Sequence, residues 1–308
     1  MILLLGAHSD TVTAALARGL RDGGNRFLMV DEDRPDGYLV SSEASGMRRA
    51  FRVRGGDCDG TSPVGSIFVR HSVPRHLDPN RVERLHALLG QLNRMLAAAS
   101  CPSVNLPANA YSNYSKPYQV GLLAAAGFDV PRTLLTNVPE EARRFYDELA
   151  GQVIFKGVSN VATLAQVLTP ERLERLKLLP HCPTLFQEYV AGVDYRVHVV
   201  GERAFVTRLR ASNEDYRRSA LAGAADLVVE PAALPAEVTA RCVAFTRQLG
   251  LAVSGIDFKE SRDGRLVALE LNPYPQFTFY EGRSGQPITR AVIDLLAHSR
   301  TDQSNVFA

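Results

Sequence analysis

Short apolar runs and amphipathic stretches alternate along the first hundred residues. Residues 2–5 are continuously apolar, which predicts a buried strand. Ser9 or Asp10 can cap a following helix, and Phe27 to Val30 predict a second strand. A strand, a helix and a strand in this order indicate a parallel α/β unit at the start of the chain.

The same patterns predict the elements of the remaining chain. A proline in the first helical turn, at Asp78-Pro79, marks a helix start, and Gly201-Glu202 marks a hairpin turn. We expect loops with short strands at 34–63. We predict, in order, a strand at 67–70, helices at 78–96 and 119–126, a strand at 130–135, a helix at 139–149, a strand at 153–156, a further apolar segment at 186–190, a hairpin over 194–210 and a helix at 235–250.

A second hairpin is predicted close to the end of the chain. Asp263-Gly264 lies between two alternating segments and is typical of a two-residue turn. With this turn Asp257 lies directly opposite Glu270, and Asn272 lies two residues further along on the same face. The other face collects the apolar side chains that a core requires: Ile256, Phe258, Val267, Leu269 and Leu271.

Two carboxylates that face each other on a sheet repel, unless a cation lies between them. Asp257, Glu270 and Asn272 offer two carboxylates and an amide oxygen, with no His or Cys nearby. Such oxygen ligands favour magnesium or manganese over zinc or copper. The alternative is a solvated hairpin in which Lys259, on the same face, is the counter-charge.

Composition narrows the class of protein. A net charge of +2 argues against a strongly basic nucleic-acid surface. The apolar start stops at Gly6, too short for a signal peptide or a membrane span. We therefore expect a cytoplasmic protein with no membrane and no nucleic-acid partner. Free thiols, without zinc-like spacing, are expected at all four cysteines: Cys58, Cys101, Cys182 and Cys242.

Lysine is rare among the 35 basic residues. A lysine is a compact point charge that suits phosphate oxygens, whereas arginine brings a planar fork. The context of each lysine is therefore informative. The four lysines are Lys116, Lys156, Lys177 and Lys259.

An ordered set of short motifs between residues 103 and 296 resembles the ATP-grasp ligases. The set comprises Lys116, Lys156 at a strand end, the run from Gln187 to Arg196, and the Asp257 hairpin. Segment 105–137 is similar to the RimK-type branch of these ligases. Segments 215–218 and 272–288 are most similar to the enzymes of microviridin-type (graspetide) pathways, which cyclise ribosomal peptides.

The resemblance implies a fold and a nucleotide site. It implies an α/β protein with the ATP-grasp fold, in which ATP and Mg²⁺ (or Mn²⁺) are the cofactors and Asp257, Glu270 and Asn272 are the metal ligands. Lys116 and Lys156 would contact the phosphates. The remaining nucleotide contacts would be Gln187, Glu188 and the backbone of Tyr189 and Val190 at the adenine edge, and Asp194 at the ribose.

Three arginines would face the transferred phosphoryl group or an acyl-phosphate: Arg196, Arg210 and Arg217. For Arg196, a structural ion pair with a residue on a neighbouring strand is as plausible as this catalytic role. The sequence does not distinguish Arg210 from Arg208 for this role. After Lys156 the chain departs from the RimK-type pattern, because segment 157–163 stands in place of a glycine-rich loop.

By the same resemblance, the expected activity is that of an ATP-dependent carboxylate ligase. It would form an acyl-phosphate and then ester or amide bonds on a ribosomal precursor peptide. One alternative is a RimK- or glutathione-synthetase-like ligase that joins an amino acid to a small carboxylate or to a peptide end. A phosphotransferase that uses the same ATP site is a third reading.

The expected domains follow from the same comparison. Residues 1–103 would form an N-terminal parallel α/β domain that precedes the ATP-grasp region, 104–185 its central subdomain, and 186–298 its C-terminal subdomain with the metal site. A loose tail would follow at 299–308. The resemblance also allows a homodimer. His71, His181 and His198 are expected to be structural.

Overall fold

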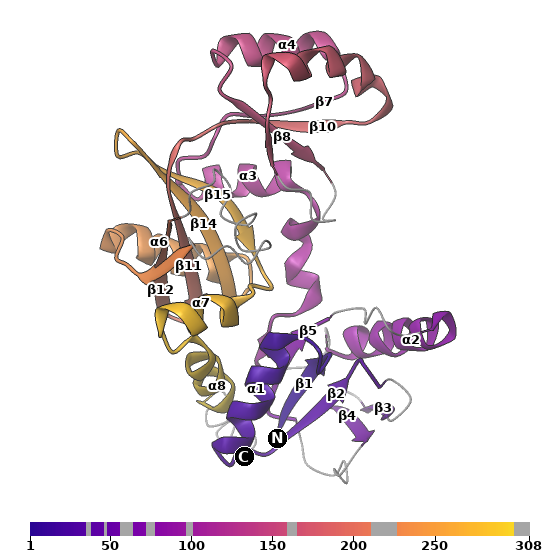
Figure 1. Cartoon of the computed structure of the whole chain (residues 1–308). Coiled ribbons are helices and arrows are strands. Elements are labelled where there is room, and N and C mark those ends of the chain that lie inside the picture. Colours follow the sequence, from indigo (N-terminus) through magenta and orange to yellow (C-terminus); the bar gives the residue numbers. More distant parts are fainter. Residues whose placement is uncertain are drawn as a thin grey trace.

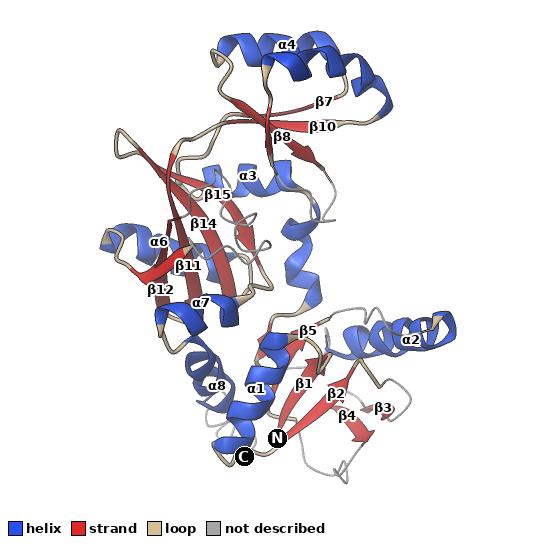
Figure 2. Ribbon diagram, in the orientation of Figure 1, coloured by secondary structure: helices blue, strands red, loops and turns tan. Residues whose placement is uncertain are grey.

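The computed structural model of the chain describes residues 1–34, 38–45, 48–55, 64–71, 78–96, 101–158, 165–210 and 227–298. These residues form four β-sheets, and the three larger sheets follow one another along the long dimension of the molecule (Figure 1). Figure 2 shows that helices flank each of these three sheets. Among the described helices, none combines the length and the apolar character that crossing a membrane requires.

The first sheet is parallel and confirms the predicted α/β unit. Its strand order is β2 (Phe27–Asp31), β1 (Ile2–Gly6), β5 (Ser66–Arg70) and β6 (Ser103–Val104). Ile2 and Leu4 pack on the side of α1 (Thr11–Asp22), whereas Leu3 and Leu5 pack on the side of α2 (Pro79–Leu96). Because β1 is buried on both faces, all of its side chains are apolar and its sequence is a continuous apolar run. Asp10 caps α1 by accepting the N–H of Thr13. β3 (Tyr38–Ser45) and β4 (Arg48–Gly55) form a separate hairpin.

The second sheet is antiparallel, with the order β7 (Thr133–Thr136), β10 (Thr184–Glu188), β8 (Val153–Gly157) and β9 (Gln166–Val167). Helix α4 (Pro139–Glu148) and the 3₁₀ segment η3 (Pro170–His181) bury its apolar face in a core that includes Phe145 and Phe186. The strand predicted at 130–135 is shifted to Thr133–Thr136. The apolar segment predicted at 186–190 overlaps β10, and Tyr189 and Val190 follow that strand. Segment η2 (Pro107–Tyr114) and helix α3 (Lys116–Ala125) connect the sheets.

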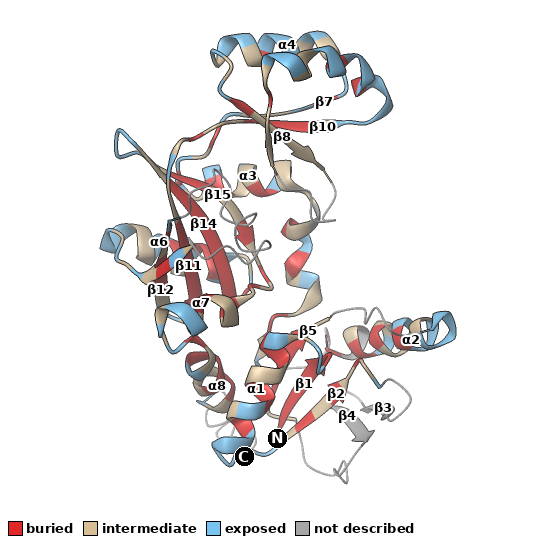
Figure 3. Ribbon diagram, in the orientation of Figure 1, coloured by how far each residue is buried: buried red, intermediate tan, exposed pale blue. Residues whose placement is uncertain are grey.

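The third sheet has five antiparallel strands in the order β13 (Val228–Pro231), β12 (Arg203–Arg210), β11 (Gly192–Val200), β14 (Val253–Ser261) and β15 (Leu266–Asn272). Helix α6 (Ala236–Gln248) covers one face. Helices α7 (Phe277–Ser284) and α8 (Ile288–His298) cover part of the other. The α8 core also takes in Leu4 and Leu16, so the first and third sheets share buried apolar side chains (Figure 3).

The hairpin between β14 and β15 corrects the predicted turn. Ser261 donates its N–H to Arg265 O at 2.9 Å, so the loop has three residues, Arg262 to Gly264, and not the two that were predicted. Gly264 has φ +83°, a conformation that favours glycine. Close to the turn the pairing is therefore displaced by one residue, and Phe258 lies opposite Ala268.

A β-bulge between Asp257 and Phe258 then restores the register. Asp257 lies opposite Glu270, as predicted, because the extra loop residue and the bulge offset each other. The bulge changes the apolar face. Ala268 takes the place of the predicted Val267 and Leu269 in the core cluster with Ile256 and Phe258. Val267 is also fully buried, but on the face of Lys259.

Candidate functional site

Charged side chains occupy adjacent register positions on one face of the third sheet. Asp194 and Arg196 of β11 lie opposite Lys259 and Asp257 of β14, and Asp257 in turn lies opposite Glu270 of β15. Residues directly opposite each other in a sheet share a face. Three strands therefore bring opposite charges together on this face. Tyr195 and Val197, which alternate with these residues on β11, enter the core under α6.

Arg196 neutralises Asp257. Its Nη1 donates to Asp257 Oδ1 at 2.6 Å, and the two residues are only 4% and 3% exposed. The cross-strand ion pair that the sequence left as an alternative for Arg196 is thus present. A buried pair of this kind holds its geometry because each charge would be costly to bury alone.

Glu270 has a different cation. The Lys116 Nζ, at the start of α3, lies 4.0 Å from Glu270 Oε2, and both side chains are about one-fifth exposed. Lys259, the counter-charge of the solvated-hairpin alternative, donates from its Nζ to Asp194 Oδ2 at 3.2 Å. The repulsion between Asp257 and Glu270 is therefore offset by Arg196 and Lys116.

Asn272 completes the predicted set of metal ligands on this face. It lies opposite Gly255, which shares the face of Asp257, and its Oδ1 accepts the N–H of Tyr274 at 2.8 Å. The three side chains offer oxygen donors from two neighbouring strands, as a hard divalent cation requires. Two side-chain cations already lie against the two carboxylates, so the face accommodates positive charge. The residues present fit magnesium.

The Arg196 guanidinium is enclosed on several sides. Its Nε lies 3.5 Å from His198 Nε2, and its Cζ lies 5.7 Å from the centre of the Tyr280 ring. Gly255 lies directly beneath it, because a Cβ there would come within 2.6 Å of Nε. Burial, and then the neighbouring charge of Arg196, lower the pKa of His198 well below its ordinary value.

Lys156 and the predicted adenine residues lie on the second sheet or directly after its strand β10. Lys156 Nζ on β8 donates to Gln187 Oε1 on β10 at 3.3 Å, and Gln187 Nε2 donates to Thr133 Oγ1. Val190 is buried, and Tyr189 donates its N–H to Gln152 O at 2.9 Å.

Glu188 joins the second sheet to the third. Its carboxylate accepts the N–H of Arg132 at 3.1 Å and a side-chain hydrogen bond from Arg265, which follows the β14–β15 loop. Glu188 was predicted to contact adenine. The structure shows its side chain bound to protein groups at the junction of the two sheets.

Of the predicted arginines, only Arg196 is seen on the Asp257 face. Arg208 lies opposite Tyr195, so it and Arg210 occupy register positions of the other face of β12. Both contact Glu230, with Arg210 Nη2 at 2.6 Å from Glu230 Oε1. The third predicted arginine, Arg217, and the glycine-poor loop residues 159–163 lie outside the described residues.

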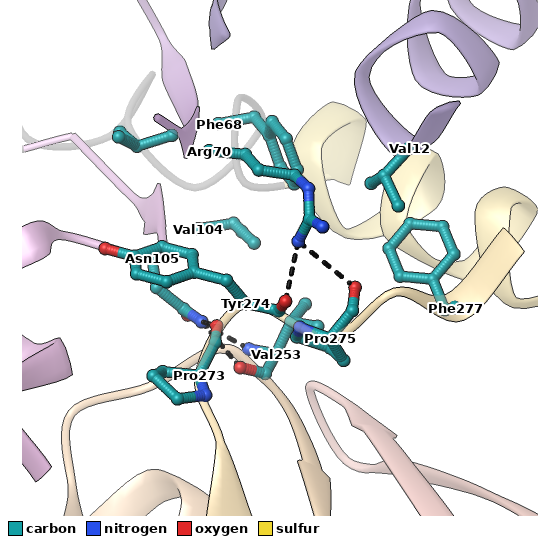
Figure 4. A pocket seen from close by; sticks show the side chains of 11 residues that line it. Val12, Phe68, Arg70, Val104, Asn105, Val253, Pro273, Tyr274, Pro275 and Phe277 are labelled. Atoms are coloured by element: carbon teal, nitrogen blue, oxygen red, sulfur yellow. Dashed lines mark hydrogen bonds between the residues drawn. The ribbon is translucent and has the colours of Figure 1, made fainter. Parts of the chain in front are cut away.

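Two residues that sequence reasoning did not assign hold the segment after Asn272 (Figure 4). Arg70, at the end of β5, donates to Tyr274 O at 2.6 Å and to the Gln276 side chain, and its Nε contacts Asp10 Oδ1 at 3.0 Å. Asn105 donates to Pro273 O at 2.5 Å. One feature of the sequence could have indicated Arg70: it ends a predicted parallel strand, where functional side chains often lie. No sequence pattern could have predicted its contacts with Tyr274 and Gln276, which are far away along the chain.

The chain is similar to known proteins over much of its length. The model of the RimK-like ATP-grasp domain matches residues 114–296, which is more than half of the chain. A probable alpha-L-glutamate ligase of Xanthomonas oryzae pv. oryzae is 31% identical over 189 residues, covering 58% of this chain and 62% of that protein. The chain thus matches less than two thirds of the length of this relative.

Solved structures match nearly the whole chain. The ATP-grasp ligase PsnB complexed with minimal precursor has 28% identity and a TM-score of 0.81, covering 97% of this chain and 98% of PsnB. The macrocyclase MdnC bound with precursor peptide MdnA from Microcystis aeruginosa MRC has 22% identity and a TM-score of 0.78, covering 96% and 99%, which shows a shared fold. The fold is the ATP-grasp fold, and the chain belongs to the RimK-like ATP-grasp family.

Proposed function

We propose that this protein is an ATP-dependent carboxylate ligase that forms ester or amide bonds on a ribosomal precursor peptide. The observation that carries the ligase chemistry is the face on which Asp257, Glu270 and Asn272 lie together with Arg196 and Lys116. The extent of the likeness favours a peptide substrate. PsnB, solved with a minimal precursor, matches 97% of the chain with 28% identity and a TM-score of 0.81.

Each cofactor contact is assigned to named residues. Asp257, Glu270 and Asn272 would hold Mg²⁺ or Mn²⁺, and the bound ion supplies charge neutralisation at the phosphates. Lys116 and Lys156 would contact phosphate oxygens. The other nucleotide contacts would be Gln187, Glu188 and the backbone of Tyr189 and Val190 at adenine, and Asp194 at the ribose.

Asp194 can bind a ribose hydroxyl and keep its present partner. Lys259 donates to one of its oxygens, Oδ2. An ionised carboxylate accepts several hydrogen bonds, so a hydroxyl can join the lysine there.

Arg196 is the arginine that the structure favours for the reacting phosphoryl group. It is the predicted arginine on the face of the three metal-ligand candidates, and a guanidinium is suited to several phosphate oxygens at once. The catalytic roles of Arg210, which contacts Glu230, and of Arg217 stay predictions. The division of the sequence into an N-terminal domain, two ATP-grasp subdomains and a loose tail stays a prediction, and so does a homodimer.

The proposed reaction has two steps. A carboxylate oxygen of the peptide attacks the terminal phosphorus of ATP, the bond to the β-phosphate oxygen breaks, and ADP leaves. A hydroxyl or amine then attacks the acyl carbon, loses its proton, and releases inorganic phosphate. The positive charge of an arginine stabilises the oxyanion of the tetrahedral intermediate, which exists after the attack and before phosphate leaves. Each bond removes one water from the peptide, and we place the reaction in the cytoplasm, where ATP is supplied.

A second candidate is a ligase that joins an amino acid to a small carboxylate or a peptide end. The 31% identity to a probable alpha-L-glutamate ligase favours it. Both candidates share the acyl-phosphate and differ in the acceptor. A phosphotransferase would instead leave a stable phosphate ester.

The test is ADP release by the purified protein with ATP and magnesium, in the presence of peptide-sized or small-molecule fractions of its host's extract. Stimulation by the peptide fraction, with loss of one water mass per bond in a peptide, supports the proposal. Stimulation by the small-molecule fraction alone would transfer the assignment to the amino-acid ligase. Hydroxylamine traps an acyl-phosphate but not a phosphate ester, so a stable phosphorylated product without hydroxamate would identify a phosphotransferase.

A further inference from the structure

His198 is a fully buried histidine with an unsatisfied ring nitrogen. The residue is 0% exposed, and its Nδ1 has no hydrogen-bond partner within the part of the chain that the structure describes. A buried donor or acceptor without a partner is destabilising. Such a group is rare in a core, where an apolar side chain of similar size would avoid the penalty.

The contact with Arg196 determines where the imidazole proton lies. Arg196 Nε carries a hydrogen and donates to His198 Nε2 in a long contact of 3.5 Å. The accepting nitrogen needs a lone pair, so a neutral ring carries its proton on Nδ1. The unsatisfied Nδ1–H is therefore a consequence of presenting an acceptor to Arg196.

Two further groups restrict the same guanidinium. At Gly255 any side chain would clash with it, since a Cβ would lie 2.5 Å from Arg196 Cζ. The Tyr280 ring of α7 lies 5.7 Å from that Cζ, and the ring centres of Tyr280 and His198 are 4.7 Å apart in an edge-to-face arrangement. We call His198, Gly255 and Tyr280 the arginine cradle.

We propose that the arginine cradle positions Arg196 for phosphoryl transfer, with His198 as the positioning residue that orients its Nε. This inference rests on the proposed function. His198 contacts the nitrogen nearest the backbone, so it orients the plane of the guanidinium without occupying the terminal nitrogens. Nη1 then points at Asp257, beside the other metal-ligand candidates. Donors held in place before the reaction stabilise developing charge without reorganisation.

A purely structural histidine makes a different prediction. If His198 only fills the core, its replacement by leucine lowers stability or leaves activity intact. If it positions Arg196, leucine removes the unsatisfied N–H and the acceptor together. The Tm of His198→Leu is then equal to or above that of the wild type, while its kcat is lower. A loss of kcat without a loss of stability identifies a positioning role.

The first experiment compares His198→Leu and His198→Gln with the wild type in ADP formation and thermal unfolding. For His198→Leu we expect a Tm equal to or above that of the wild type, a kcat lowered about tenfold, and a KM for ATP within about twofold. His198→Gln keeps an acceptor for Nε and should recover part of kcat. A folded His198→Leu protein with wild-type kcat would overturn the inference.

Ser112→Ala is the matched control. Ser112 Oγ is the other buried side-chain atom without a partner among the described residues, and it belongs to η2. Its removal should likewise keep or raise Tm, but kcat should not change. A matching fall in kcat in both variants would refute a specific action of His198 through Arg196.

A double-mutant cycle with Arg196→Gln tests the coupling. Once Arg196 is replaced, His198→Leu should cause no further loss of kcat. Multiplying losses would show that His198 acts by another route.

A spectroscopic readout separates this inference from the proposed function. The Nε–H resonance of Arg196, assigned through Arg196→Lys, should shift or broaden in His198→Leu and stay unchanged in Ser112→Ala. If the wild-type protein forms no ADP with any fraction, the proposed function fails. The resonance still decides whether His198 orients the guanidinium, and an unchanged resonance refutes the cradle.

Discussion

Asp257 and Glu270 face each other across neighbouring strands, yet each carboxylate has a cation of its own. Arg196 contacts Asp257 from β11, and Lys116 approaches Glu270 from α3. The two ion pairs differ in burial, because the Arg196 pair is almost completely enclosed and the Lys116 pair is about one-fifth exposed. Removing Glu270 should therefore affect chemistry more than folding, whereas removing Asp257 should affect both.

Glu270→Gln should abolish ADP formation, with kcat at least about 100-fold below that of the wild type, because the amide cannot supply the anionic oxygen that a divalent ion needs. Stability should change by less than about 1 kcal/mol, since the Lys116–Glu270 pair is long, at 4.0 Å, and remains partly open to solvent. ADP release and urea unfolding measure the two effects. Glu202→Gln, an exposed turn residue, is the control. Wild-type turnover in Glu270→Gln would disprove the metal assignment.

Asp257→Ala should lower the free energy of unfolding by about 3–5 kcal/mol, because it leaves the Arg196 charge buried without its partner. Urea denaturation of the nucleotide-free protein measures this loss. The control is Asp294→Ala, which breaks the exposed pair with Arg290 and should cost no more than about 0.5 kcal/mol. Equal effects of the two substitutions would mean that the Arg196 pair is not buried in solution.

Arg70→Ala should loosen the segment that follows Asn272. The guanidinium of Arg70 donates to Tyr274 O and to the Gln276 side chain, so its removal should cost about 2 kcal/mol of unfolding free energy. The magnesium concentration for half-maximal ADP formation should rise several-fold, as about tenfold weakening is typical when support of a metal ligand is lost. Arg18→Ala, on the exposed side of α1, should change neither quantity. A stability loss without a shift in the magnesium dependence would limit Arg70 to a structural role.

His71 should make stability depend on pH. Burial by itself lowers the pKa of His71. The hydrogen bond and charge of Glu32, together with a hydrogen bond to the Asn93 side-chain oxygen, raise the pKa above its ordinary value. A histidine whose pKa is raised by folding contributes stability that is fully present below the unfolded-state pKa of about 6.5 and is lost as pH rises through the folded-state value.

Urea unfolding at about pH 6 and pH 9 tests this dependence. The stability difference between His71→Gln and the wild type should be larger at the lower pH. His86→Gln, an exposed replacement on α2, should show no such trend. An equal effect of His71→Gln at both pH values would show that the histidine is not charged when paired with Glu32.

The β14–β15 hairpin shows which features local sequence patterns can predict and which they cannot. Asp263-Gly264 correctly indicated a turn, and the opposition of Asp257 and Glu270 was confirmed. The two-residue loop was wrong, because Gly264 with positive φ fits a three-residue loop followed by a bulge as well as a two-residue turn. Helix α3 begins at Lys116, three residues before the predicted start, because the Ser115 side chain accepts the N–H of Tyr118.

The sequence by itself determined most of the strands and helices up to the Asp257 hairpin, the pairing of the two carboxylates and the family, because periodic burial and short motifs are local properties of the chain. Tertiary structure decided the rest. It placed Arg196, and not Arg210, on the face of Asp257, and it brought Arg70 of the first sheet to the segment after Asn272. These contacts join residues far apart in sequence. Their positions depend on strand register between non-adjacent segments and on the apolar core shared by the first and third sheets, which no local spacing encodes.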